Sequence, residues 1–278
     1  METEETWAHH LAELRPDLDP WNLGVGGYGL DQAVLRLERV AAELQPDEVW
    51  IGLMPSALPR MLSLYRPAEN HWSGAVAFKP RFRLDAGALV DVPCPGDSPE
   101  ALVALLGSAE RFWSATGTYD EFVARAPLAY ARRGSHWSHR SGLARLALTW
   151  HESRLRPSLA ARLADPEGEL RGLTRALAAR AALSGPVRVL VLPSRGDLAD
   201  PAPGLGELLE QLRADGHLVH DLSRALIASP GDWRPRGHYG PEQNLAVAAA
   251  LAELVGLPRV QDADPSASPS PPIGIHRR

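Results

Sequence analysis

Apolar residues recur along the chain with two different spacings. Between Leu30 and Leu44 (LDQAVLRLERVAAEL) they fall three and four residues apart, which predicts an amphipathic helix. Other segments with helical spacing cover residues 170–182, 205–214 and 241–255. Three short runs bounded by turn signals predict strands over residues 49–53, 187–192 and 218–222. Helices that alternate with buried strands are typical of the α/β class, with a parallel sheet between two helical layers.

The middle of the chain, residues 66–165, is less regular and is expected to form an insertion or cap outside the central sheet. Within it, residues 78–84 and 88–92 flank Asp85-Ala86-Gly87, which predicts a hairpin. Predicted helices in this region cover residues 99–106, 121–130 and 143–154. We expect one domain over residues 1–260, followed by a disordered Pro/Ser-rich tail over 261–278.

Composition excludes several classes of protein. The 278 residues carry a net charge of −5, without a basic stripe that would indicate nucleic-acid binding. Cys94 is the only cysteine, so neither a disulfide within the chain nor a cysteine metal cluster is expected. No apolar run is long enough to span a membrane, and the polar start, Met1 to His10, is unlike a signal peptide. As written, the chain is expected to be cytoplasmic.

Two loops carry the residues best placed for chemistry. Asn22 to Gln32 (NLGVGGYGLDQ) lies between a weak predicted strand over 19–25 and the helix that begins at Leu30. Glycine amides at such a helix entrance can donate to a developing oxyanion, although the spacing also suits a phosphate loop or a simple tight turn. His238 lies in the loop before the last helix, at the carboxyl ends of the strands, where open parallel sheets place their sites.

Together the two loops resemble the second and fifth sequence blocks of the SGNH hydrolase family, also called GDSL hydrolases. Gly27 matches the family's oxyanion glycine, and His238 matches its catalytic histidine. The segment Pro46 to Gly52 resembles the strand that leads to the third block. The resemblance covers most of residues 2–255. It implies a flavodoxin-like three-layer sandwich and ester hydrolysis, in which a serine attacks, a histidine takes its proton and an aspartate orients the histidine.

The chain departs from the family at three blocks. The first block, a central strand ending in Gly-Asp-Ser, would precede a segment like Glu4 to Leu11, so the resemblance implies that this strand and the nucleophile are missing. The third-block asparagine is absent from Met54 to Ala57, where Ser56 could substitute weakly as an oxyanion donor. Asp232 is the nearest carboxylate before His238 and is the candidate to orient it.

Simpler interpretations stand beside these assignments. His238 could cap the last helix or lie exposed in a loop, and Gly27 could be only a turn glycine. Asn22 is a candidate oxyanion or cleft residue, and its simpler interpretation is a brace that bonds loop backbone. Gly96-Asp97-Ser98 spells the family tripeptide, but Ser98 precedes a proline at the start of a predicted helix and is expected to be its N-cap.

Arginines at positions 60, 66 and 81 could line an anionic substrate pocket or form salt bridges. His136, His139 and His151 do not have the spacing of a zinc motif, so neither a metal nor another cofactor is expected. The expected partner is a small-molecule or carbohydrate ester.

Three hypotheses follow for the function. The first is an SGNH-like ester hydrolase whose first block lies upstream of the printed start. The second is a catalytically inactive relative that binds ligands in the remaining cleft. The third is an O-acyltransferase acting on cell-surface carbohydrate.

Overall fold

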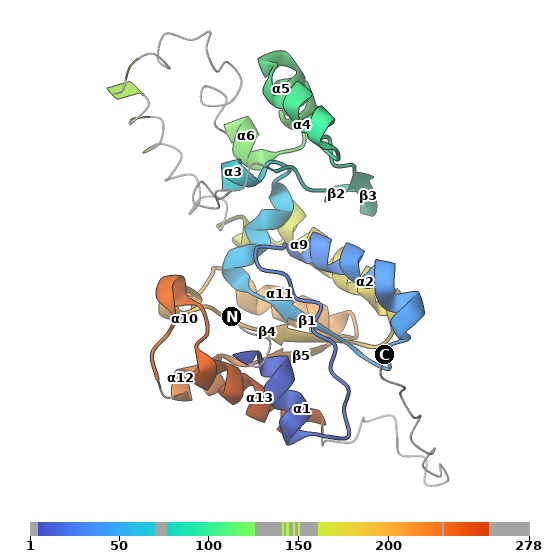
Figure 1. Ribbon diagram of the computed structural model, residues 1–278, viewed down its shortest axis with the longest axis vertical. Helices are drawn as coiled ribbons and strands as arrows, with labels where there is room; N and C mark the ends of the chain where they lie inside the picture. Colours follow the sequence, from blue (N-terminus) through green and yellow to red (C-terminus); the bar gives the residue numbers. More distant parts are fainter. Residues whose placement is uncertain are drawn as a thin grey trace.

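The computed structural model describes residues 5–69, 77–125, 161–229 and 231–255, together with 141, 143–144, 147 and 150. A three-stranded parallel sheet in the order β1-β4-β5 lies at its centre (Figure 1). Its strands are β1 (Val49–Leu53), β4 (Val187–Val191) and β5 (Leu218–Asp221). The prediction of an α/β fold with these three strands is therefore confirmed.

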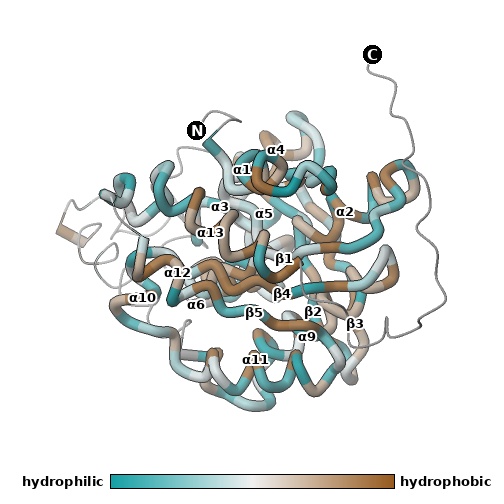
Figure 2. The backbone as a smooth tube through the Cα atoms, turned by 90° about the horizontal axis from the view of Figure 1, so that it is seen from below, coloured by the Kyte–Doolittle hydropathy of each residue, from teal (hydrophilic) through white to brown (hydrophobic). Residues whose placement is uncertain are grey.

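Alternate side chains of β4 face two different helical layers, which explains why nearly every residue of this strand is apolar. Val187, Val189 and Val191 pack in one core cluster, and Leu190 packs in a second cluster on the opposite face. The first layer contains α2 (Leu30–Leu44), α9 (Glu169–Ala181) and α11 (Leu205–Ala214). The second contains α1 (Trp7–Leu14), α12 (Ser223–Ala228) and α13 (Pro241–Val255) (Figure 2).

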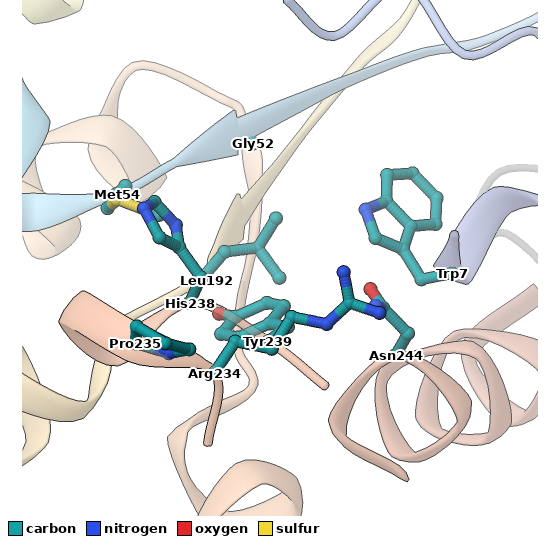
Figure 3. Close-up of a pocket in the computed structure, with 9 residues that line it drawn as sticks. All are labelled: Trp7, Gly52, Met54, Leu192, Arg234, Pro235, His238, Tyr239 and Asn244. Atoms are coloured by element: carbon teal, nitrogen blue, oxygen red, sulfur yellow. The ribbon is translucent and has the colours of Figure 1, made fainter. Parts of the chain in front are cut away.

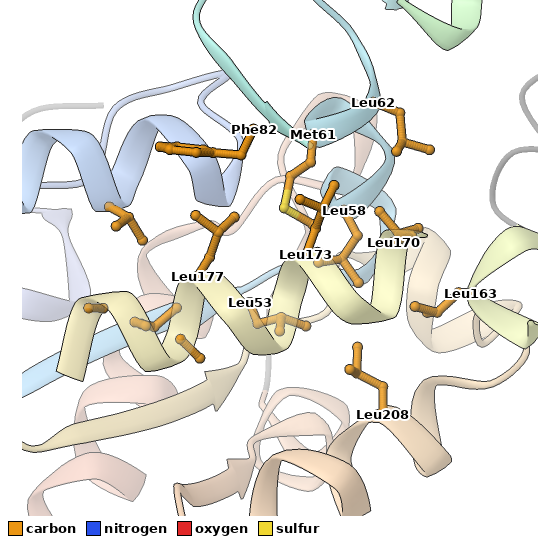
Figure 4. Close-up of a cluster of buried hydrophobic side chains, with 14 of the residues drawn as sticks. Leu53, Leu58, Met61, Leu62, Phe82, Leu163, Leu170, Leu173, Leu177 and Leu208 are labelled. Carbon is orange, nitrogen blue, oxygen red and sulfur yellow. The ribbon is translucent and has the colours of Figure 1, made fainter. Parts of the chain in front are cut away.

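The helix α9 supplies the centre of the first layer. Leu170, Leu173 and Leu177 lie on one of its faces and are each at most 1% exposed (Figure 4). Phe82 packs in the same cluster, although it belongs to the predicted insertion. The insertion therefore shares its hydrophobic core with the sheet.

The hairpin in this insertion forms as predicted, outside the parallel sheet. It pairs β2 (Arg81–Asp85) with β3 (Ala88–Val92) in antiparallel register. Ala86 and Gly87 both have positive φ, as a two-residue turn of this kind requires. The first strand begins three residues later than expected, because Phe78 instead forms an isolated bridge with Tyr65.

The remaining helices of the insertion confirm part of the sequence analysis. They are α3 (Arg66–Glu69), α4 (Pro99–Leu106), α5 (Ala109–Thr116) and α6 (Glu121–Arg125). Ser98 is the N-cap of α4, because its side chain accepts a hydrogen bond from the amide of Ala101 at 3.1 Å. Residues 126–130, most of the expected helix over 143–154, and the tail over 261–278 lie outside the described residues.

Short elements complete the described chain. The 3₁₀ helices are η2 (Pro55–Leu62), η4 (Ala161–Ala164), η5 (Ala182–Ser184) and η6 (Pro235–Gly237), and a short helix α10 covers Arg195–Ala199.

The weak strand expected over residues 19–25 was predicted wrongly. This segment is irregular, and the side chain of Trp21 is 64% exposed. A strand is stable only when its backbone pairs with a neighbour, and this segment pairs with no strand of the described sheet.

Candidate functional site

A pocket of about 570 Å³ lies at the carboxyl end of the parallel sheet (Figure 3). It is enclosed by α1, the ends of β1 and β4, the loop before α13, and the first turn of α13 itself. The lining residues are Trp7, Gly52, Met54, Leu192, Arg234, Pro235, His238, Tyr239 and Asn244. Open parallel sheets bind ligands at this end of their strands. Of the predicted site residues, the pocket contains only His238.

His238 is carried by a tight turn. The amide of Arg234 donates to the carbonyl of His238 at 2.9 Å, and the amide of Gly237 donates to the carbonyl of Arg234 at 3.1 Å. Gly237 has φ +76°, and a side chain there would meet the backbone and Cβ of Arg195 in α10. The turn therefore needs glycine at this position. The His238 side chain is exposed and lies beside Met54 (Figure 3).

Tyr239 anchors this loop to the end of β4. Its hydroxyl donates to the carbonyl of Pro193 at 2.9 Å, and its ring meets the ring of Trp233 edge-on at 5.5 Å. Burial raises the pKa of the Tyr239 phenol well above its usual value, and the nearby Asp197 carboxylate adds to that shift. The phenol is therefore a hydrogen-bond donor that fixes the loop in which His238 lies.

Replacing Tyr239 by phenylalanine is expected to cost about 0.5–1.5 kcal/mol of folding free energy, because the Pro193 carbonyl loses its donor. The histidine loop should also loosen. We would measure urea unfolding and the exchange of the His238 amide, with Tyr119→Phe, at an exposed side chain, as the control. Equal stability and exchange in the two variants would contradict this anchoring role.

The first turn of α13 holds the other side of the loop. Gln243 and Asn244 are almost fully buried, and both bond the backbone of Gly240. The Gly240 amide donates to Gln243 Oε1 at 2.9 Å, and Asn244 Nδ2 donates to the Gly240 carbonyl at 3.1 Å. At the pocket mouth, Arg234 forms an ion pair of 2.7 Å with Glu5, just ahead of α1.

Asp232 and Ser56 lie outside the pocket lining. Asp232 is exposed, and the structure gives no contact between its carboxylate and His238. The Ser56 hydroxyl donates to Asp197 Oδ2 at 2.9 Å. The same oxygen accepts from the Ser194 amide at 2.8 Å and from the Ser194 hydroxyl at 2.7 Å. Asp197 thereby ties together the segments that follow β1 and β4.

The sequence analysis did not single out Asp197. The sequence does hold one local pattern that includes Asp197. Ser194 lies three residues before Asp197, shortly after a buried strand, and this spacing is that of a capping box. That pattern would have predicted a helix start. It could not have predicted the contact with Ser56, which lies 141 residues away in the chain.

The glycine turn also lies near the carboxyl end of β1, although it does not line the pocket. Arg60, in η2 directly after β1, donates to the carbonyl of Tyr28 at 3.1 Å. Gly27 has φ +85°, and a side chain there would collide with the Arg66 guanidinium. Asn22 does not line the pocket, and its side chain accepts a hydrogen bond from the Gly24 amide at 3.0 Å, as the brace interpretation predicts.

The three arginines considered for an anionic pocket all form ion pairs. Arg66 pairs with Glu69 at 2.8 Å, and Arg60 approaches the same carboxylate at 3.8 Å. Arg81 pairs with Glu169 at 2.6 Å. These contacts favour the salt-bridge interpretation of the arginines.

Comparisons with known proteins add no relative: no family model, no curated protein and no solved structure matches the chain. Among the described residues, no group of three or more His, Cys, Asp or Glu side chains could hold a metal ion. No helix in the described part of the chain is both long and apolar enough to cross a membrane.

Proposed function

We propose that the chain is an SGNH-like ester hydrolase in which His238 is the general base. The observation that carries this proposal is the position of His238 in a pocket of about 570 Å³ at the carboxyl end of a parallel sheet. This volume suits a small-molecule ligand. Trp7, Met54 and Leu192 give the pocket apolar walls suited to an acyl group.

The lining residues supply a base without an evident nucleophile. They include no serine, threonine or cysteine, and the Tyr239 hydroxyl is committed to the Pro193 carbonyl. The resemblance to SGNH hydrolases implies a serine on a strand ahead of α1. Trp7, the first residue of α1, lines the same pocket as His238, so a serine shortly before it would lie near that pocket. Gly27 is the oxyanion donor that the resemblance implies, but it does not line the pocket, so the proposal rests on His238 and not on Gly27.

Hydrolysis of a p-nitrophenyl ester tests the proposal. The full chain would be extended ahead of Met1 by an apolar strand ending in Gly-Asp-Ser, with an otherwise identical extension ending in Gly-Asp-Ala as the matched control. We expect ester turnover and covalent labelling by a fluorophosphonate with the serine extension alone. Equal, background rates for the two extensions would refute the hydrolase.

A binding protein without catalysis is the second candidate, favoured by the absence of a serine, threonine or cysteine among the pocket-lining residues. In that case the unextended chain would bind a short-chain ester in calorimetry, and Leu192→Trp, which fills the pocket, would abolish the binding. The serine extension would then leave the ester intact.

A further inference from the structure

The lining of the pocket contains a cation and no carboxylate. Among the lining residues, which all belong to the described part of the chain, Arg234 carries a full charge and none is an aspartate or a glutamate. The remaining polar side chains are His238, Tyr239 and Asn244, of which none is negatively charged at neutral pH. The electrostatics of the pocket therefore favour an anionic ligand over a cationic one.

Arg234 and His238 enter the pocket from the same turn. They face each other in an antiparallel bridge, in which the Arg234 amide donates to the His238 carbonyl at 2.9 Å. Residues paired in this way carry their side chains on the same side of the backbone. From there the two side chains diverge, since the imidazole points toward Met54 and the guanidinium points toward Trp7 and Asn244 (Figure 3). A ligand that fills the pocket can thus meet the histidine at one end and the arginine at the other.

The surface between these two polar ends is apolar. Leu192 lies between the imidazole and the guanidinium in Figure 3, and Trp7 and Met54 add apolar walls. The Tyr239 hydroxyl is committed to the Pro193 carbonyl, so this residue presents its ring to a ligand. The arrangement suits a ligand with an apolar body and one charged end.

Arg234 keeps hydrogen-bond donors for such a ligand. Its Nη2 donates to Glu5 Oε2 at 2.7 Å, and within the described ranges the guanidinium makes no other side-chain hydrogen bond. A guanidinium has five N–H groups and can bind a carboxylate through two parallel hydrogen bonds. The side chains of Arg234 and Glu5 are 34% and 36% exposed, so water screens the attraction between them. A ligand carboxylate can therefore share the guanidinium with Glu5 or displace it.

We infer that the pocket binds a carboxylate with an apolar body, and that Arg234 holds the carboxylate group. This binding does not depend on ester chemistry. As for the substrate, the inference rests on the proposed function: the ester whose bond lies at His238 carries a free carboxylate at the far end of its acyl group.

Calorimetric titration of the unextended chain with octanoate and with octanamide tests the inference, because the two probes share an apolar body and differ in charge. We expect octanoate to bind about tenfold more tightly or better. Arg234→Gln should weaken octanoate binding by about tenfold or more and leave octanamide binding unchanged. The matched control is Arg213→Gln, at an exposed arginine that pairs with Glu210, which should leave both affinities unchanged. Leu192→Trp, which fills the pocket, should abolish the binding of both probes.

A further variant, Glu5→Gln, separates recognition of the carboxylate from the structure of the loop, because it breaks the same ion pair and keeps the arginine. We expect it to bind octanoate at least as tightly as the parent does, since the competing carboxylate is gone. A loss of octanoate binding in Glu5→Gln equal to that in Arg234→Gln would overturn the inference.

Three other results would also overturn it: no binding of octanoate to the parent chain, equal affinity for the two probes, or octanoate binding that survives Leu192→Trp. None of these results bears on hydrolysis of a neutral ester by the serine-extended chain. Conversely, arginine-dependent binding of octanoate without ester turnover in the serine-extended chain would remove the proposed function and leave carboxylate binding standing.

Discussion

Replacing Asp31 by alanine is expected to destabilise the protein by about 3–5 kcal/mol, because it leaves a buried lysine without its counter-charge. Asp31 is fully buried in the first turn of α2, and its carboxylate accepts from Nζ of Lys79. Lys79 is 6% exposed, and its other contact is the carbonyl of Pro80 at 3.2 Å. Water therefore cannot replace the lost carboxylate without opening the core. Urea unfolding at pH 7 measures the loss.

A double variant separates the ion pair from simple packing. Asp31→Leu combined with Lys79→Met removes both charges and keeps apolar volume, so it should be much closer to the parent in stability than Asp31→Ala alone. A cost below about 1 kcal/mol for Asp31→Ala, the range of exposed ion pairs, would show that the pair is solvated.

Replacing Asp120 by alanine is expected to cost about 3 kcal/mol or more, because it strands several buried donors, each worth about 1–3 kcal/mol when unsatisfied. The Asp120 carboxylate is 1% exposed and accepts five hydrogen bonds of 2.6–3.0 Å. The donors are the Ser63 hydroxyl and the amides of Leu64, Tyr65, Phe122 and Val123. The residue thus joins the segment after η2 to the first turn of α6.

Burial raises the pKa of Asp120, and the hydrogen bonds from Tyr65, Val123, Leu64 and Ser63 oppose that rise. Asp120→Asn keeps one acceptor oxygen and should lose less stability than Asp120→Ala. The control is Asp97→Ala, at an exposed position, which should change stability by less than about 0.5 kcal/mol. Similar unfolding midpoints for Asp120→Ala and this control would contradict the bracing role.

The sequence predicts those parts of the fold that local patterns determine. The apolar run at 49–53 forms β1, and most of the run at 187–192 forms β4. These runs are apolar because β4 is buried on both faces and β1 pairs with it. The helix over 30–44 has the bounds that its apolar spacing indicates. The strand expected over 19–25 failed for a non-local reason, since its formation depends on a neighbouring strand.

In the site, too, local patterns predict some residues, and other residues depend on contacts between distant parts of the chain. His238 could be found because a loop before a terminal helix has a fixed place in an α/β fold. The pocket partners Trp7 and Met54 carry no local signal, and they meet His238 only through the tertiary fold. The Asp31–Lys79 pair joins residues 48 positions apart, so periodicity gives no indication of it.

The central claim is that the imidazole of His238 is the base of a hydrolytic site. The most direct measurement is p-nitrophenyl ester turnover by the serine-extended chain, with and without His238→Ala. We expect the histidine substitution to lower kcat by about 10²–10⁴-fold, the range typical of a general base. His217→Ala, ahead of β5 at the opposite end of the sheet, should leave the rate unchanged. Equal rates for His238→Ala and His217→Ala would contradict the claim.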